Sequence, residues 1–304
     1  MTFSLNRRHF TLGAAGLAAS SLLPVQAFAQ DAMRTVVTAA GSVDIPVNPK
    51  RVVAIDSRLD LQPALALGLN VVGYGHSTPG SWVPVPEGLE FYGSEINVEQ
   101  VLASNPDLII CADYDPDSVW WPANKLRTIA PVVQTSNYKP WKDAFRELAT
   151  LLGMDGAGEG ALAEYDALIA DIKARHGDKL ANKTVVSIQP AEGALYLMNG
   201  TMMLQPQVLA DLGAKTIPPK QDQEYDSGEI PPEAFGDTLG SVDGILMATS
   251  VDEANPLTGN TMWDRLPAVA SGAMIASNGN INYGSIYSAI QVAKFVDELY
   301  GKMA

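Results

Sequence analysis

The residues of this 304-residue chain that could do chemistry follow short apolar runs typical of buried strands. In the first half they include Asp56, Arg58, His76, Trp82, Tyr114, Trp120 and Trp121, and in the second half Met202, Met203, Tyr225 and Tyr283. Arginine offers charged hydrogen-bond donors, aromatic rings offer large rigid contact areas, and methionine offers adaptable apolar contact. Because ligands of open α/β sheets bind beyond the carboxyl ends of the strands, this set favours binding of a bulky, partly apolar ligand over catalysis. The alternative for each single aromatic residue is that it packs within its own lobe, as we expect of Trp141 and Trp263.

Several kinds of catalytic or metal site are excluded by the motifs. The segment Gly75-His76-Ser77-Thr78-Pro79 lacks the second glycine of a hydrolase nucleophile elbow, and no dinucleotide fingerprint or phosphate loop occurs. The three histidines are His9, His76 and His176, too scattered for a multi-histidine zinc site, so no metal is expected to bind the protein directly. Cys111 is the single cysteine, which excludes an intrachain disulfide. A carboxylate pair for acid–base chemistry stays open among the 34 acidic residues.

Alternating strands and helices must position these residues. The pattern predicts strands over 50–55, 70–74, 107–111 and 131–134, and helices over 60–67, 98–103, 124–129 and 141–152. This alternation indicates an α/β chain with a parallel, doubly wound sheet. The second half echoes the first, since residues 183–188 resemble 50–55 and Leu204-Gln205-Pro206 resembles Leu61-Gln62-Pro63. Two lobes of one architecture explain the echoes, although any two α/β units also look alike.

A long helix is expected between the two halves. Leu162, Tyr165, Ile169 and Ile172 fall on one helical face, and Gly177 is expected to end that helix. Such a helix is about 30 Å long and makes a stiff connector. The sequence therefore divides into a leader at 1–29, a first lobe at 30–156, a connecting helix at 157–178 and a second lobe at 179–304.

The first 29 residues have the character of an export signal. The pair Arg7-Arg8 precedes a short apolar run, and Ala27-Phe28-Ala29 is a small-x-small cleavage site. The arginine pair indicates Tat-type export, with an ordinary Sec signal as the alternative. No cysteine lies near the cleavage site, so we expect a free, soluble protein in the periplasm that begins near Gln30.

The net charge narrows the choice of partner. The chain carries 34 acidic and 20 basic side chains, a net charge of −14, and loss of the two leader arginines lowers it to −16. Nucleic acid is excluded as a partner because it requires clustered Lys and Arg.

A set of ordered motifs resembles a known family. These motifs include Arg51-Val52-Val53-Ala54, Asn97-Val98-Glu99, Asn105-Pro106-Asp107-Leu108-Ile109 and Tyr283-Gly284-Ser285-Ile286-Tyr287. From about Arg51 to Lys302 the chain resembles the periplasmic substrate-binding proteins of iron–siderophore ABC importers, most closely the ferric hydroxamate (ferrichrome-type) branch. The resemblance implies the class III fold, in which one long helix bridges two Rossmann-like lobes with parallel-rich sheets. It also implies a shallow ligand cleft between the lobes, no catalytic residue and no cofactor, and we expect a monomer.

The same resemblance implies site residues by motif position. Ligand contacts are expected from Arg58, Trp82 and Tyr114 in the first lobe and from Met202, Met203, Tyr225 and Tyr283 in the second. Trp120 and Trp121 join them from the aromatic rim. Asp117 and Glu233 match the acidic residues with which family members dock on an inner-membrane ABC permease. The segment before Asn97 lacks the arginine that the hydroxamate branch often has, and Arg58 is expected to take its place.

Charge also bears on the ligand. A tris-catecholate iron complex carries several negative charges and calls for an Arg/Lys cluster, which this rim lacks. The expected ligand is therefore a ferric siderophore of the hydroxamate type, and the siderophore, not the protein, holds the iron. One alternative is haem or a corrinoid on the same scaffold, for which His76 would be the feature to watch. A remoter alternative is a secreted α/β enzyme.

Overall fold

The structure is a computed structural model that describes residues 32–38, 40–191, 194–219, 228–249, 257 and 259–303. The expected export signal at residues 1–29 and the expected contact residue Tyr225 lie outside these ranges. In the described part of the chain, no helix combines the length and apolar character needed to cross a bilayer.

The first sheet is fully parallel, in the order β5-β4-β3-β6-β7. Its strands are β3 (Val52–Asp56), β4 (Val71–Gly75), β5 (Glu90–Phe91), β6 (Leu108–Ala112) and β7 (Val132–Thr135). Every residue of β3, β6 and β7 is buried, as expected of apolar strands that are covered on both faces. The expected strands are thus confirmed.

The helices around this sheet begin and end on local signals. They are α1 (Leu61–Ala66), α2 (Val98–Ala103), α3 (Ala123–Leu126) and α4 (Trp141–Leu152). The side chain of Asn97 caps α2, and Gly153 ends α4 in the left-handed conformation at φ 65°. The helix expected over 124–129 is shorter, because the chain turns at Arg127 toward β7. We call this sheet and its helices the N-terminal lobe; the hairpin of β1 (Met33–Thr38) and β2 (Gly41–Pro46) precedes it.

The second sheet is mixed, in the order β10-β9-β8-β11-β12. Its strands are β8 (Val185–Ala191), β9 (Ala194–Leu197), β10 (Gly228–Ile230), β11 (Gly244–Met247) and β12 (Met274–Ala276). β8, β11 and β12 are parallel as expected, whereas β9 and β10 run antiparallel to their neighbours. Only two residues separate β8 from β9, and a parallel crossover needs a dozen or more, so β9 must run back along β8.

Short helices surround this sheet and complete the C-terminal lobe. They are α6 (Leu204–Leu212), the 3-10 turn η1 (Pro232–Ala234), α7 (Phe235–Leu239), α8 (Thr261–Asp264) and α9 (Pro267–Ala270). The chain finishes with α10 (Ile286–Lys302), a helix that the sequence analysis did not identify.

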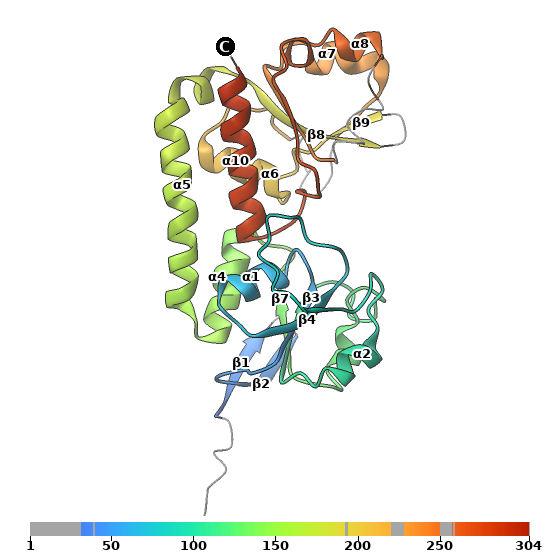
Figure 1. Cartoon of the computed structure of the whole chain (residues 1–304), viewed down its shortest axis with the longest axis vertical. Coiled ribbons are helices and arrows are strands. Elements are labelled where there is room, and N and C mark those ends of the chain that lie inside the picture. Colours follow the sequence, from blue (N-terminus) through green and yellow to red (C-terminus); the bar gives the residue numbers. More distant parts are fainter. Residues whose placement is uncertain are drawn as a thin grey trace, which may run out of the picture.

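Helix α5 (Asp155–Asn182) bridges the two lobes. It has 28 residues and is about 42 Å long, and it packs against α10 along one side of the molecule (Figure 1). The expected stop at Gly177 is wrong, because the helix continues to Asn182. Leu180, beyond the glycine, is buried in the core, and its burial outweighs the roughly 1 kcal/mol that a glycine costs inside a helix.

The largest apolar cluster belongs to both lobes at once. It joins Val52 and Leu108 of the first sheet to Leu246 of the second through the inner faces of α5 and α10. Each lobe has a smaller cluster of its own on the other face of its sheet. The α/β prediction, with two sheet-containing lobes and a long helix between them, is confirmed.

Candidate functional site

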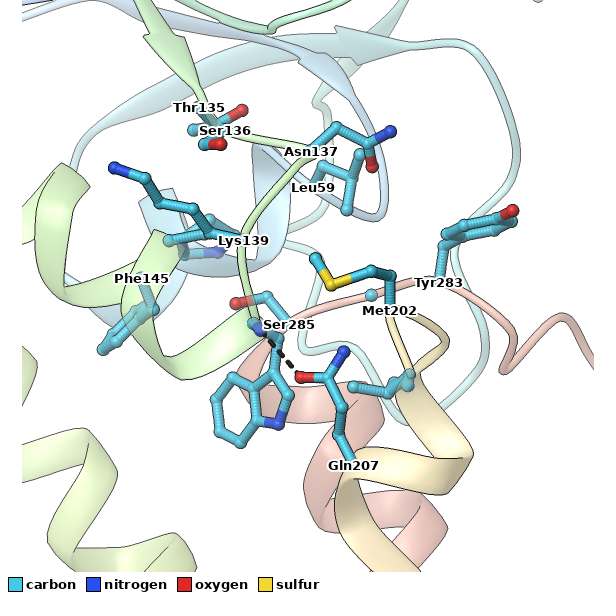
Figure 2. Close-up of a pocket in the computed structure, with 15 residues that line it drawn as sticks. Leu59, Thr135, Ser136, Asn137, Lys139, Phe145, Met202, Gln207, Tyr283 and Ser285 are labelled. Atoms are coloured by element: carbon cyan, nitrogen blue, oxygen red, sulfur yellow. Dashed lines mark hydrogen bonds between the residues drawn. The ribbon is translucent and has the colours of Figure 1, made fainter. Parts of the chain in front are cut away.

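A hollow lies where the two lobes meet, and we call it the cleft. The N-terminal lobe contributes residues that follow β3 and β7, among them Leu59, Asn137 and Lys139. From the C-terminal lobe, Met202 and Tyr283 face them (Figure 2). The enclosed part of the hollow is small, about 40 Å³, and its space continues into solvent. Residues of both lobes line it, so a ligand that enters it would contact both lobes.

Asp56, at the end of β3, is fully buried and organises one wall of the site. Its Oδ1 accepts from the backbone N–H groups of Arg58 at 2.7 Å and Leu59 at 3.2 Å, and from Nε of Arg58 at 3.2 Å. Its Oδ2 accepts from Nη2 of Arg58 at 2.9 Å and from the indole N–H of Trp121 at 3.1 Å. Burial would raise the pKa of Asp56, but the charge and hydrogen bonds of Arg58 outweigh it and hold that pKa below its usual value. The carboxylate thereby fixes both an arginine and a tryptophan.

A second buried carboxyl, Asp60, lies beneath the first. It accepts from the backbone N–H groups of Asp56 at 2.7 Å and Ala112 at 3.0 Å, and its Oδ1 lies 2.5 Å from the hydroxyl of Thr135. Burial, and then the charge of Asp56, raise the pKa of Asp60 to about 7. This carboxyl ties β3, β6 and β7 together under the site.

Four aromatic rings form a cluster beside Arg58, which we call the ring cluster: His76, Tyr114, Trp120 and Trp121. Tyr114 stacks on Trp121 with ring centres 4.0 Å apart, and His76 lies 4.7 Å from the same indole. Burial lowers the pKa of His76, whose Nε2 is 3.9 Å from Oδ2 of Asp56. The guanidinium of Arg58 lies 5.6 Å from the ring centre of Tyr283, so a cation–π contact crosses between the lobes.

The structure brings together part of the set that the sequence proposed. Arg58, Tyr114, Trp121 and Tyr283 form one connected group, and Met202 lines the cleft with Tyr283. Trp120, at the outer edge of the ring cluster, is 47% exposed.

Two other members of that set are engaged in packing. The indole N–H of Trp82 donates to Ser288 Oγ at 3.2 Å, and its ring meets Phe295 of α10 edge to face. Met203, directly before α6, is 3% exposed and belongs to the interior. Tyr225 is outside the described residues.

The two acids expected to dock on a permease are exposed on different lobes. Asp117 lies in the loop after β6, where its Oδ1 accepts from the amide of Asn124 at 2.9 Å. Glu233 lies in η1. Both side chains are accessible from solvent.

Two glutamines that were not among the expected site residues join the lobes: the buried Gln62 and the half-buried Gln207. Oε1 of Gln62, in α1, accepts from the backbone N–H groups of Ser285 at 3.3 Å and Ser288 at 2.9 Å, at the start of α10. In the opposite direction, Oε1 of Gln207 in α6 accepts from the backbone N–H of Trp141, the first residue of α4, at 2.9 Å (Figure 2). Each lobe thus satisfies a helix N-terminus of the other.

A sequence signal for these contacts was present in the repeated Leu-Gln-Pro. Gln62 and its counterpart Gln205 are both buried, and Nε2 of Gln205 donates to Oδ1 of Asn282 at 2.6 Å. Both glutamines therefore bond to the segment that leads into α10. Asp56 and Asp60 carried a signal as well, since two acids four residues apart follow a buried strand.

Known proteins share sequence and fold with this chain. The profile of the family described as "Periplasmic binding protein" matches residues 56–278. A probable siderophore-binding lipoprotein of Bacillus subtilis (strain 168), YfiY, is 30% identical over 263 residues, which are 79% of this chain and 78% of that protein. The iron(3+)-hydroxamate-binding protein FhuD of Escherichia coli (strain K12) is 24% identical over 289 residues, 85% of this chain and 89% of that protein.

The fold is shared with solved structures too. The Fe3+–Desferal-bound siderophore binding protein FhuD from Vibrio cholerae superposes with a TM-score of 0.67 at 22% identity, over 84% of this chain and 100% of that one. A periplasmic solute binding protein from Mycobacterium smegmatis gives a TM-score of 0.73 at 19% identity, over 90% of this chain and 99% of that one. At such identities the likeness establishes the fold.

Proposed function

This chain belongs to the periplasmic binding protein family, and from that membership we propose that it captures a ferric siderophore and delivers it to an ABC importer of the inner membrane. The family expected from the sequence motifs is confirmed. The relatives in Bacillus subtilis and Escherichia coli are named for binding siderophores and iron(3+)-hydroxamates, which supports this ligand class. The V. cholerae protein of the same fold holds a ferric hydroxamate, Desferal.

The observation that carries the ligand class is the pairing of Arg58 with Asp56. The guanidinium gives two of its hydrogen bonds to a buried carboxylate, so the wall carries a cation whose charge is already balanced. A ferric trihydroxamate core is neutral and rich in oxygen acceptors, whereas a ferric tris-catecholate carries several negative charges that such a wall does not offset. A hydroxamate-type siderophore therefore fits this site.

The contacts divide by chemistry. In this proposal Arg58 donates to the iron-bound oxygens, while Tyr114, Trp121, Tyr283 and Met202 pack against the apolar parts of the chelate. Trp120 and Tyr225 complete the proposed contact set, which leaves out Trp82 and Met203 because both are engaged in packing. The two lobes that hold the ligand lie on either side of helix α5 (Asp155–Asn182), which replaces the expected bounds of 157–178 for the connecting helix.

Intrinsic fluorescence tests the ligand class. Titration with a ferric trihydroxamate is expected to quench the tryptophan emission, because Trp120 and Trp121 lie at the site. Arg58→Gln is expected to weaken the binding at least tenfold by removing charged donors. Arg146→Gln, at an exposed ion pair on α4, is the control and should bind as the wild type does. Absence of quenching by ferric hydroxamates, together with tight binding of a catecholate or of haem, would overturn the proposal.

Delivery is proposed to depend on Asp117 and Glu233 meeting basic residues of the permease. Replacing both acids by lysine should lower uptake of the iron complex into cells while leaving its affinity for the isolated protein unchanged. Glu298→Lys on α10 is the control for a surface charge reversal. Full uptake by the double variant would contradict the docking role.

Export completes the proposed path. The family is described as periplasmic binding proteins, and we propose that the leader at 1–29 directs this chain to the periplasm. Export is proposed to use the Tat pathway, with cleavage near Ala29 and Gln30. Lysine in place of both Arg7 and Arg8 should then block export, and the N-terminal sequence of the mature protein identifies the cleavage point. The mature protein is proposed to act as a monomer, which light scattering can check.

A further inference from the structure

The positive charge of Arg58 is balanced by the buried carboxylate of Asp56. We propose that Asp56 sets the charge class of the siderophore: by neutralising Arg58, it makes the site reject chelates with a net negative charge. This inference rests on the proposed function and adds a residue that determines specificity within it. Without Asp56 the same arginine would attract anionic complexes.

The geometry makes this pairing a fixed property of the site. Asp56 is fully buried, and its two oxygens accept five hydrogen bonds in all, from Arg58, Leu59 and Trp121. The side chain of Arg58 is 16% exposed, and within the described residues its Nη1 has no hydrogen-bond partner. A ligand therefore meets one edge of the guanidinium while the carboxylate stays behind the other edge.

Among the residues that the structure describes, the other groups around Arg58 add no positive charge. Burial lowers the pKa of His76, which favours its neutral form. Burial raises the pKa of Tyr114, which keeps that phenol neutral, and Tyr283 contributes its ring face. Asp60, hydrogen-bonded to the backbone of Asp56, adds negative charge whenever it is ionised. Lys139 also lines the cleft, but its Nζ donates to Glu147 at 2.8 Å. The wall is thus neutral or negative.

Charge control can be separated from a merely structural role. If Asp56 only held Arg58 in place, its replacement would weaken all chelates in similar proportion. If its charge selects the ligand, replacement must change anionic and cationic chelates in opposite directions relative to each other. In Asp56→Asn the amide oxygen can still accept from the backbone of Arg58 and Leu59, while the guanidinium is released from its counter-charge.

The experiment uses three ferric trihydroxamates that share one iron centre. Ferric desferrioxamine B carries a pendant ammonium, its N-acetyl derivative is uncharged there, and its N-succinyl derivative is negative. We expect the wild type to bind the succinyl complex most weakly. In Asp56→Asn, the ratio of the dissociation constants of the succinyl and ammonium complexes should fall roughly tenfold at low salt, as a unit charge within a partly desolvated site requires. The change should shrink at 0.5 M salt.

Two further variants keep the result interpretable. Arg58→Gln leaves Asp56 unbalanced, so the same ratio should rise roughly tenfold, which tests the idea even if Asp56→Asn does not fold. Asp178→Asn, exposed on α5, is the matched control and should leave the ratio unchanged. A ratio that stays constant in the variants that bind overturns this inference alone. A wild type that binds none of the three complexes overturns the proposed function and this inference with it.

Discussion

At the residue scale, the neighbours of the buried carboxyl of Asp60 allow it to hold a proton. Its Oδ2 accepts two backbone N–H groups, and its Oδ1 faces the hydroxyl of Thr135, which can serve as acceptor as well as donor. The neutral acid therefore satisfies every neighbour, with Oδ1–H donating to Thr135. Burial and the nearby charge of Asp56 favour this form and raise the pKa of Asp60 to about 7. In the unfolded chain the same group ionises near its usual pKa of 3.8.

Asp60→Asn should therefore be increasingly stable relative to the wild type as the pH rises. Between pH 4 and 7 the folded wild type binds more protons at this group than the unfolded chain, so its stability falls with increasing pH. The asparagine amide copies the neutral acid and needs no proton. Its advantage over wild type should grow by about 1.4 kcal/mol per pH unit up to pH 7 and then level off. Urea unfolding at pH 5 and pH 8 measures this. A variant that is less stable at both values would show that Asp60 is ionised in the fold.

At the element scale, the sequence predicted correctly those helices and strands whose signals lie within the segment itself. The β-branched run of β3 and the Asn97 cap of α2 are local, and both elements lie where they were expected. The predicted helix end at Gly177 was wrong because Leu180, beyond the glycine, is buried and keeps the chain helical. The antiparallel β9 follows from a connection of two residues, whose length the periodicity of the strands does not reveal.

The site could be predicted only by the rule that ligands bind beyond the carboxyl ends of parallel strands. That rule placed Arg58, Tyr114 and Trp121 together, since all three follow parallel strands of one sheet. It placed Trp82 at the same rim, yet this indole bonds to Ser288, because α10 occupies that position. The contacts of Gln62 span more than 220 residues, so the repeated Leu-Gln-Pro can mark this glutamine but does not identify its partners.

Two glycines of α5 should respond oppositely to alanine. No atom lies within 4 Å of a Cβ built on Gly177, so Gly177→Ala should raise the free energy of unfolding by about 0.5–1 kcal/mol. A Cβ on Gly158 would lie 2.8 Å from the Cβ of Ala149 in α4, so Gly158→Ala should lower it by about 1–3 kcal/mol. Urea unfolding of both variants makes each the control of the other. A loss of stability in Gly177→Ala would mean that the helix is broken at that point.

At the scale of the whole molecule, the lobes are held together by more than the bridging helix. One apolar cluster is continuous through both lobes, and Gln62 and Gln207 each serve a helix N-terminus in the opposite lobe. Opening the cleft would leave those backbone N–H groups without acceptors, at about 1–3 kcal/mol for each one that stays buried. The arrangement therefore disfavours wide hinge motion and keeps Arg58 and Tyr283 on facing walls.

Gln62→Leu tests this coupling directly. The leucine fills a similar volume but leaves the backbone N–H groups of Ser285 and Ser288 without their acceptor, so stability should fall by about 2–4 kcal/mol. Affinity for a ferric trihydroxamate should fall as well, because Tyr283 lies two residues before Ser285 and loses its fixed position opposite Arg58.

Two further variants are needed to interpret the result for Gln62→Leu. Gln62→Glu keeps an acceptor at the start of α10, where a carboxylate is favoured by the helix dipole, and should lose less than half as much stability as the leucine variant. Gln100→Leu, on the exposed face of α2, should stay within about 0.5 kcal/mol of wild type. Guanidinium unfolding and fluorescence titration supply both quantities. If Gln62→Leu folds and binds like wild type, the shared apolar cluster alone holds the lobes, and the glutamines are not what keeps the cleft in register.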